Sequence, residues 1–447
     1  MKKVVPLDSL AIQKISAGFF IEALWVVNRH YQSGRFSPRV LFSKASGKAV
    51  PVKIRFPNHR RDGVLNSMKK IAAFFAAALL LLVILSACQQ FGKIPDNAVD
   101  SRIAKSVNYH VEEQRFINGF TAPNPPRPPQ LSFWDDPFGK RQPNFLFNRN
   151  QTTPTSALPQ VNYDDLSAEA AASNGLQFVW LGHSTLLLFI GGATVLVDPV
   201  FSKAAAPLPI IVRRFQPPPI TLEALPPIDY VMISHDHYDH LDMASIKHFT
   251  DSDVRFLVPL GVAAHLLHWG VAPRKIIELD WWESFTEQGL KFTATPAQHF
   301  SGRLGPFLNN KSLWSSWVIE NQSQSVFFSG DSGYSDHYKN IGNQLGPFDF
   351  VFMDSGQYDE QWRSVHNMPS EVIRGFKDLK GRYLIPIHWG MFSLSLHNWF
   401  DPPERVTQLA RAENITVLTP KLGELISISR PPPFQSWWRN ISAATAP

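Results

Sequence analysis

The sequence predicts a layered α/β domain, and two observations carry this prediction. From about residue 175 onward, short apolar and β-branched runs broken by glycine and proline alternate with helical candidates, a mixture typical of sheets packed against helices. Most of these runs end in polar residues, as the run before "SHDHYDHLD" at 234–242 does. Nothing repeats at a fixed period, which argues against a solenoid.

The expected elements follow in chain order. The stretch "LQFVWLGHSTLLLFIGGATVLVDP", which starts at Leu176, predicts two strands joined as a hairpin by a turn at Gly191-Gly192. Further strands are expected at 229–234, 290–297, 316–320, 325–330, 349–354 and 383–388. Helices are expected at 242–250, 261–269, 369–379 and 402–413.

Composition and charge limit the function classes. The 447 residues, 44% hydrophobic and 18% charged, suffice for one large or two ordinary globular domains. The net charge of +6 is unevenly placed: residues 1–67 hold twelve Lys or Arg and three Asp or Glu, which leaves a net of −3 for residues 68–447. Because this mildly acidic body has no basic stripe for phosphate backbones, we expect no nucleic-acid partner.

A secretory signal is expected at residues 68–88, within "MKKIAAFFAAALLLLVILSACQQ". Two lysines precede an apolar run from Ile71 to Leu85, which is short for a membrane span and typical of a signal peptide. The run ends in "LSAC", which resembles a bacterial lipobox, so Cys88, the only cysteine, is expected to be lipidated; the alternative is an incidental thiol. Gln89 follows in place of the aspartate of inner-membrane retention signals, which implies a lipid anchor in the outer membrane, facing the periplasm of a bacterial envelope.

The rest of the chain divides into segments that differ in composition. The basic extension 1–67 precedes the signal and is either a disordered arm or upstream sequence. We favour the second interpretation, in which Met68 is the true start and the extension is not part of the mature protein. Residues 89–172 are polar, with five prolines in "TAPNPPRPPQ" at 121–130, and predict a tether and an arm that wraps on the domain through aromatics such as Phe116. A catalytic domain is expected at 173–430 and a C-terminal tail at 431–447.

Histidines and aspartates follow the expected strands, and strand ends at one edge of a sheet can converge. The residues are Asp198, His235, His237, Asp239, His240, His299, Asp331 and His388. Imidazole and carboxylate ligands without thiolate suit Zn²⁺, the metal we expect, and also fit Mn²⁺ or Fe²⁺. An extended "HDHYDH" points residues 235 and 237 the same way, so one loop can serve two metal ions. Isolated histidines such as His183 and His265 are expected to be ordinary hydrogen-bonded residues.

The pattern H-x-H-x-D-H, followed by isolated His, Asp and His at strand ends, resembles the metallo-β-lactamase superfamily over about residues 175–428. The resemblance implies an αββα four-layer sandwich with an irregular N-terminal arm and a metal site on the shared edge of two sheets. It implies one metal held by His235, His237 and His299, a second held by Asp239, His240 and His388, and Asp331 as the bridge between them. Asp198 would orient ligands without binding metal.

Several short stretches of the sequence resemble one branch of this superfamily, that of N-acyl phosphatidylethanolamine-hydrolysing phospholipase D and its bacterial relatives. The stretches are "GHST" at 182–185, "DPVFS" at 198–202, "FFSGDSGY" at 327–334 and "IPIHWGMFSL" at 385–394. The best-known β-lactamases lack the second histidine that His240 supplies, which argues against antibiotic hydrolysis. Two departures, the exchanged order of Asn367 and Met368 and Leu308 in place of an aspartate, fall outside the ligands and concern substrate contacts.

The implied mechanism uses a hydroxide shared by two divalent ions about 3.5 Å apart, which attacks a phosphorus or carbonyl centre. Asp331 and Asp239 would act in catalysis as metal ligands, and His366 is the candidate acid for the leaving alcohol. Arg303 is a candidate phosphate ligand, with plain surface exposure as the alternative. The aromatic stretches "DWWESF" at 280–285 and "RPPPFQSWW" at 430–438 are expected to contact a bilayer or line an acyl groove, with ordinary packing as the alternative.

The expected function is a membrane-tethered phospholipase D-like phosphodiesterase that acts on N-acyl phosphatidylethanolamine or a related phospholipid. One alternative is hydrolysis of a small lactone or cyclic phosphate ester. Another is an envelope lipoprotein with a structural metal site, although such sites usually close with four ligands and leave no place for water. The sequence leaves the oligomeric state open.

Overall fold

The structure is a computed structural model. It describes residues 69–75, 77–78, 88–96, 101–119, 148–163, 166–171, 175–303, 308–433 and 435–443. The chain divides into two units, Met1–Ala73 and Phe74–Pro447, and the second carries the fold. The expected extension 1–67, the lipobox residues before Cys88 and the proline-rich stretch 121–130 lie outside the described residues. Across the described ranges, no helix combines the length and apolarity needed to cross a membrane.

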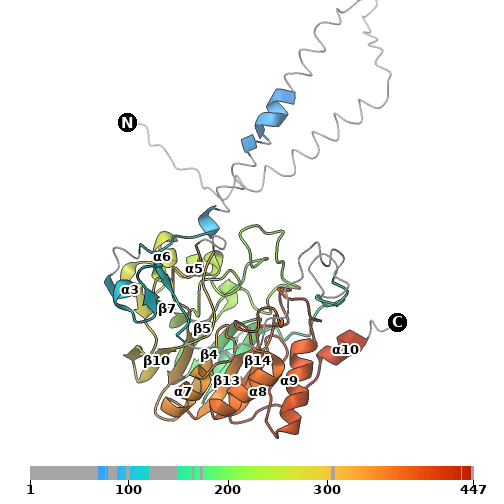
Figure 1. The fold of residues 1–447 in the computed structure, drawn as a ribbon. Coiled ribbons are helices and arrows are strands. Elements are labelled where there is room, and N and C mark those ends of the chain that lie inside the picture. Colours follow the sequence, from blue (N-terminus) through green and yellow to red (C-terminus); the bar gives the residue numbers. More distant parts are fainter. Residues whose placement is uncertain are drawn as a thin grey trace, which may run out of the picture. The chain divides into compact units, whose positions relative to one another are not determined.

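Two sheets form the centre of the second unit (Figure 1). The seven-stranded sheet has the order β15-β3-β4-β5-β6-β7-β8, with β3 Gln177–Gly182, β4 Thr185–Ile190, β5 Ala193–Val197, β6 Tyr230–Met232, β7 Arg255–Pro259, β8 Ile276–Leu279 and β15 Leu425–Ser427. The six-stranded sheet has the order β14-β13-β12-β11-β10-β9, with β9 Ser284–Glu287, β10 Leu290–Thr295, β11 Ser316–Glu320, β12 Ser325–Phe328, β13 Phe348–Asp354 and β14 Gly381–Ile387. Strands β5 to β8 pair in parallel, as do β12 to β14.

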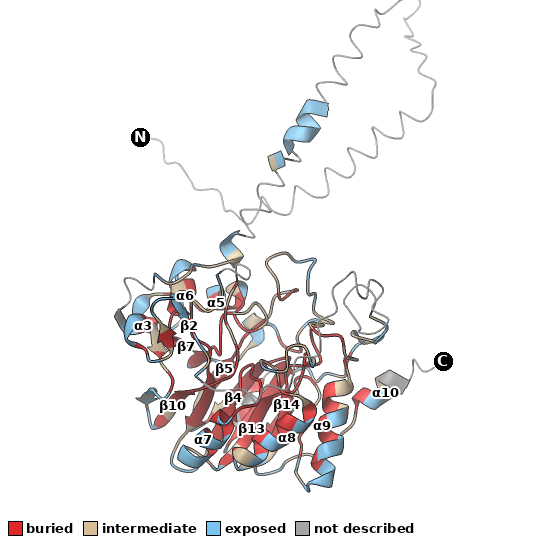
Figure 2. Cartoon of the chain, viewed as in Figure 1, coloured by how far each residue is buried: buried red, intermediate tan, exposed pale blue. Residues whose placement is uncertain are grey.

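Three apolar layers hold the sheets and helices together. Alternate residues of β3 show the division, because Phe178 and Trp180 belong to the cluster between the sheets while Val179 and Leu181 belong to the outer cluster. That outer cluster also contains residues of α5 (Met243–His248) and α6 (Ala263–His268), and a third joins the six-stranded sheet to α7 (His337–Gln344), α8 (Pro369–Asp378) and α9 (Asp401–Ala412). Figure 2 shows buried residues concentrated in the sheets and on the inner faces of these helices. The expected αββα sandwich is confirmed.

The first expected hairpin differs from the structure in one respect. Its turn at Gly191-Gly192 is present between β4 and β5, but the run before it forms two strands instead of one. The chain reverses at Gly182 and His183, whose φ angles of 102° and 54° lie in the left-handed region. A side chain at position 182 would also meet Met391 at 2.6 Å from its Cβ, so glycine fits there. The missed turn places His183 at the edge of the sheet.

The segments that flank the sandwich pack on it. In the arm, α3 (Ser101–Lys105) and the small hairpin of β1 (Tyr109–His110) and β2 (Arg115–Phe116) contribute Ile103 and Phe116, both fully buried, to a cluster with Trp281 and Trp314. A short helix, α4 (Leu166–Ala171), precedes β3. At the other end, α10 (Trp438–Ala443) and the residue before it bring two buried tryptophans into the central cluster. The aromatics of 430–438 therefore include core residues rather than a bilayer-facing pair.

Candidate metal centre

The candidate site forms where strands of both sheets end at one edge. The polar residues directly follow or come within a few residues of β5, β6, β10, β12 and β14; they are Asp198, His235, His299, Asp331 and His388. Because the carboxyl ends of parallel strands meet at the same edge, residues far apart in the sequence lie in one place. All seven predicted ligands are brought together there.

The first group consists of His235, His237, His299 and Asp331, whose potential ligand atoms all lie within 4.8 Å of one another. His237 Nδ1 lies 2.9 Å from His235 Nε2 and 3.3 Å from His299 Nε2. Asp331 Oδ2 lies 3.8 Å from His235 Nε2 and 3.7 Å from His299 Nε2. Three imidazole nitrogens and one carboxylate oxygen in this arrangement form a nitrogen and oxygen ligand set of the kind that Zn²⁺ binds.

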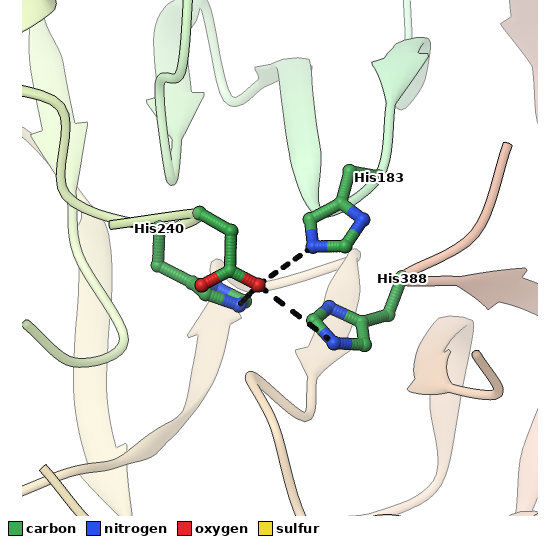
Figure 3. Close-up of side chains that lie close together, drawn as sticks. His183, His240 and His388 are labelled. Atoms are coloured by element: carbon green, nitrogen blue, oxygen red, sulfur yellow. Dashed lines mark hydrogen bonds and ion pairs between the residues drawn. The ribbon is translucent and has the colours of Figure 1, made fainter. Parts of the chain in front are cut away.

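The second group consists of Asp239, His240, His388 and also His183, again within 4.8 Å. Figure 3 shows the three histidines converging on a carboxylate oxygen, Asp239 Oδ2, which lies 2.8 Å from His183 Nε2, 3.4 Å from His240 Nε2 and 4.0 Å from His388 Nε2. Asp331 connects the two groups, because its Oδ1 lies 3.1 Å from His240 Nε2.

Two features show that a divalent cation fits these residues. His240 Nε2 and Asp331 Oδ1 are buried 3.1 Å apart and, among the described residues, neither forms a hydrogen bond of good geometry, so a cation would satisfy both atoms. Burial lowers the pKa of His235, His299 and His388 well below the usual value, and lowers the pKa of His237 to about 4. These imidazoles are therefore neutral near pH 7, as metal ligation requires.

Hydrogen bonds behind the ligands fix their orientation. Asp198 Oδ2 accepts a bond from His240 Nδ1 at 2.7 Å, and the two Asp198 oxygens also accept from the backbone N–H and hydroxyl of Ser234 at 2.7 and 2.6 Å. His299 Nδ1 lies 3.0 Å from the backbone carbonyl of Val365. Because Nδ1 of both His240 and His299 is taken up by these bonds, Nε2 of each ring faces the site. Hydrogen bonds of this kind behind a metal ligand commonly fix which ring nitrogen is free to bind the metal.

Comparison with known proteins agrees with this geometry. A model of the beta-lactamase superfamily domain matches residues 193–389. A protein of Mycobacterium tuberculosis is 42% identical over 292 residues, which cover 64% of this chain and 77% of that protein. The chain belongs to the metallo-β-lactamase superfamily. It is also similar to N-acyl-phosphatidylethanolamine-hydrolyzing phospholipase D 1 of Caenorhabditis elegans (34% over 295 residues, 60% of this chain and 80% of the relative) and to outer membrane protein RomA of Klebsiella pneumoniae (43% over 95 residues, 21% and 70%).

Membership of this superfamily, which includes metal-dependent hydrolases, gives the two histidine and aspartate groups a role as metal-binding clusters. Two residues near them were not predicted. His183 was expected to be an ordinary histidine, and only the missed turn after β3 brings it to Asp239. Asp354 ends β13 and is fully buried; the signal that marked Asp198, a carboxylate at the end of an apolar run, was present at Asp354 as well.

His366, the candidate acid, lies beside the clusters. Its Nδ1 is 2.8 Å from Asp354 Oδ2, and its ring centroid lies 5.2 Å from the rings of both His299 and His388. Burial opposes the charged imidazole, but the Asp354 carboxylate outweighs this effect, so the pKa of His366 is raised. Asp331, Asp354, His366 and His388 form a third group of close potential ligand atoms.

Arg303 is neither exposed nor free to bind a phosphate. It is buried, and its Nη1 donates to the backbone carbonyls of Asp236 and Leu241 at 2.7 and 2.8 Å, while Nη2 donates to the carbonyl of Gln90 at 2.7 Å. The side chain of Asp236 belongs to none of these groups and accepts from His265 Nε2 at 3.3 Å. The loop that carries the predicted ligands between residues 235 and 240 is called the metal-binding loop below. Arg303 holds both ends of this loop and ties it to the arm.

The arm also reaches the first cluster directly. Asn118 Nδ2 donates to the backbone carbonyl of His299 at 2.8 Å, and the backbone N–H of His299 donates to Asn118 Oδ1 at 3.2 Å. Trp314 Nε1 donates to the same oxygen at 3.2 Å. A residue of the expected tether and arm thus positions a predicted metal ligand.

Proposed function

We propose that this superfamily member is a phospholipase D-like phosphodiesterase that cleaves N-acyl phosphatidylethanolamine or a related phospholipid. The observation that carries the proposal is the pair of ligand groups joined by Asp331, which suits an in-line displacement at phosphorus. Support for the substrate class comes from the relative named as an N-acyl-phosphatidylethanolamine-hydrolyzing phospholipase D, at 34% identity over 80% of its length.

In this proposal His235, His237 and His299 would hold one metal ion and Asp239, His240 and His388 would hold the second. Asp331, which lies against both groups, would be available to either ion. Two bound divalent cations, Zn²⁺ being the expected metal, would supply Lewis-acid activation of water and of the phosphoryl oxygens. His183 and Asp198 orient Asp239 and His240 through the bonds at 2.8 and 2.7 Å.

Departure of the alcohol needs a proton, and His366 is the proposed source. The Asp354 carboxylate can only accept, so His366 Nδ1 carries the hydrogen of that 2.8 Å contact. The remaining nitrogen, Nε2, then holds the proton for the leaving group. The raised pKa of His366 keeps part of the population charged near neutral pH.

We further propose that the protein is lipid-anchored in the outer membrane and faces the periplasm. Cys88 is a free and exposed thiol at the end of the lipobox-like run, so its sulfur is available for diacylation. A relative that is 43% identical over 95 residues is named an outer membrane protein. The anchor would keep the enzyme at the surface that contains a phospholipid substrate.

The deciding experiment measures metal content together with hydrolysis of bis(p-nitrophenyl) phosphate and of N-acyl phosphatidylethanolamine in mixed micelles. We expect about two metal ions per chain and release of N-acylethanolamine. Asp331→Ala should lose metal and both activities, whereas Asp251→Ala, a change at an exposed site, should lose neither. Two metal ions with turnover of lactones and not of diesters would replace the proposal with the small-ester alternative. If the folded protein binds no metal, the interpretation as a non-catalytic envelope lipoprotein would replace the proposal.

A further inference from the structure

A hairpin-like loop at residues 203–213, called the finger below, extends from the rim of the metal centre. Ala204 and Arg213 form an antiparallel bridge at its base, and the backbone N–H of Ala205 donates to the carbonyl of Val212 at 3.0 Å. In Figure 1 the chain near residue 210, in green, projects beyond the sheets on the side where α5 lies. The finger is thus a paired structure with a defined tip.

The tip is apolar and faces solvent. It has the sequence "PLPII" at 207–211, in which Ile210 is 78% exposed and Ile211 is 48% exposed. Single exposed apolar residues are common, but two adjacent isoleucines at the end of a projecting loop form a patch that water solvates poorly. Such a patch favours a partner that removes it from water.

The base of the finger is basic. Lys203 and Arg213 are both exposed and stand next to the bridge that closes the finger. Apolar residues at a tip with cations behind them match the depth profile of a membrane surface, where hydrocarbon begins below anionic headgroups.

Both ends of the finger are fixed to the metal centre. On one side, Ser202 donates from its backbone N–H and hydroxyl to Asp242 at 3.1 and 2.7 Å, and Asp242 follows the metal-binding loop by two residues. On the other side, the backbone N–H of Phe215 donates to the carbonyl of Met391, three residues after His388. A surface that binds the finger would therefore also determine how the metal centre is oriented toward that surface.

The start of the arm lies at the same place. Gln90, two residues after Cys88, lines a cavity of about 280 Å³ together with the finger residues Ala204 and Pro207 and the loop residue Tyr238. A lipid attached to Cys88 would therefore enter a bilayer close to the finger. The anchor point and the apolar tip can engage one membrane surface.

We propose that the finger inserts its tip into the interfacial region of a phospholipid bilayer, where Lys203 and Arg213 contact anionic headgroups. The edge that contains the metal centre then faces the membrane. This inference goes beyond the proposed hydrolysis, because it concerns binding alone and holds whichever ester the enzyme cleaves.

The test uses the full chain with Cys88→Ser, which removes the only cysteine and allows a single new one. Ile210→Cys or, as a matched control, Leu409→Cys on α9, where the leucine is 38% exposed, is labelled with an environment-sensitive fluorophore. The protein is reconstituted in vesicles of phosphatidylethanolamine and phosphatidylglycerol. Quenching by nitroxide-labelled lipid and by aqueous iodide is then measured, with metal content as the check on folding.

We expect lipid quenching at position 210 to exceed that at position 409 by about threefold or more, with protection from iodide. Adding Lys203→Glu and Arg213→Glu should weaken lipid quenching at position 210 on these vesicles but not on vesicles of phosphatidylcholine alone. Equal access of iodide to both positions would overturn the proposal. A blue shift at position 210 that appears without vesicles and grows with protein concentration would also overturn it, in favour of contact with a second copy.

Discussion

Asp198 Oδ2 lies 2.7 Å from His240 Nδ1, and both side chains are fully buried. Asp198 belongs to none of the groups of potential ligand atoms, yet its bond to Nδ1 leaves Nε2 of His240 to face Asp331. The metal centre therefore depends on a carboxylate that need not bind metal itself.

Asp198→Asn should weaken metal binding while leaving the fold in place. An amide can present its N–H to His240 Nδ1 and so select the wrong tautomer, and we expect about 10- to 100-fold lower affinity for one of two metal ions. Competition with a chromogenic chelator measures this affinity. Asp251→Asn, at an exposed position, is the control, and equal affinities in both variants would show that Asp198 does not orient a ligand.

Removal of metal should destabilise the protein, because His240 Nε2 and Asp331 Oδ1 would stay buried without a hydrogen bond of good geometry. A free metal concentration about a thousandfold above Kd corresponds to about 4 kcal/mol of stabilisation. Thermal unfolding with and without chelator should therefore differ by about 10 °C. The same experiment on Asp331→Ala should show little difference, whereas a full shift in that variant would locate the stabilising metal elsewhere.

His366→Ala should affect substrates according to their leaving group. Alkyl phosphodiesters need a protonated leaving alcohol, so we expect their kcat to fall by about 10²- to 10⁴-fold. Bis(p-nitrophenyl) phosphate releases a stable anion and should lose much less. Asp354→Asn, which replaces the acceptor at 2.8 Å from His366 Nδ1, should show the same selectivity. A uniform loss for both substrates would assign His366 to metal or substrate positioning instead.

Arg303→Met should lower the free energy of unfolding by about 3 kcal/mol. The change leaves the carbonyls of Asp236 and Leu241 buried without their charged donor, at a cost of about 1–3 kcal/mol for each group. Urea denaturation measures the difference. Arg274→Met, at an exposed position, should change stability by less than about 0.5 kcal/mol, and similar values for both variants would refute the structural role of Arg303.

The sequence predicted some elements of the fold and missed others, and burial explains the difference. Strands such as β12 and β13 were recognised because nearly every residue in them is buried and most of these residues are apolar. Helix α7, "HYKNIGNQ", was missed because polar residues dominate it and only tertiary packing buries part of one face. The turn at Gly182 was missed because an apolar run continues on both sides of it.

Residue types and spacing by themselves determined the candidate ligands, since several histidines and aspartates that each follow an apolar strand can converge at one edge of a sheet and form a shared site. Only the tertiary structure decided which single residues join them. His183 and Asp354 enter the centre, Arg303 closes the loop from within, and Asn118 of the arm supports His299. The reason is physical. The periodicity of a strand sets the face of the sheet to which each side chain points, but the partner of an individual side chain depends on contacts between segments that are distant in sequence.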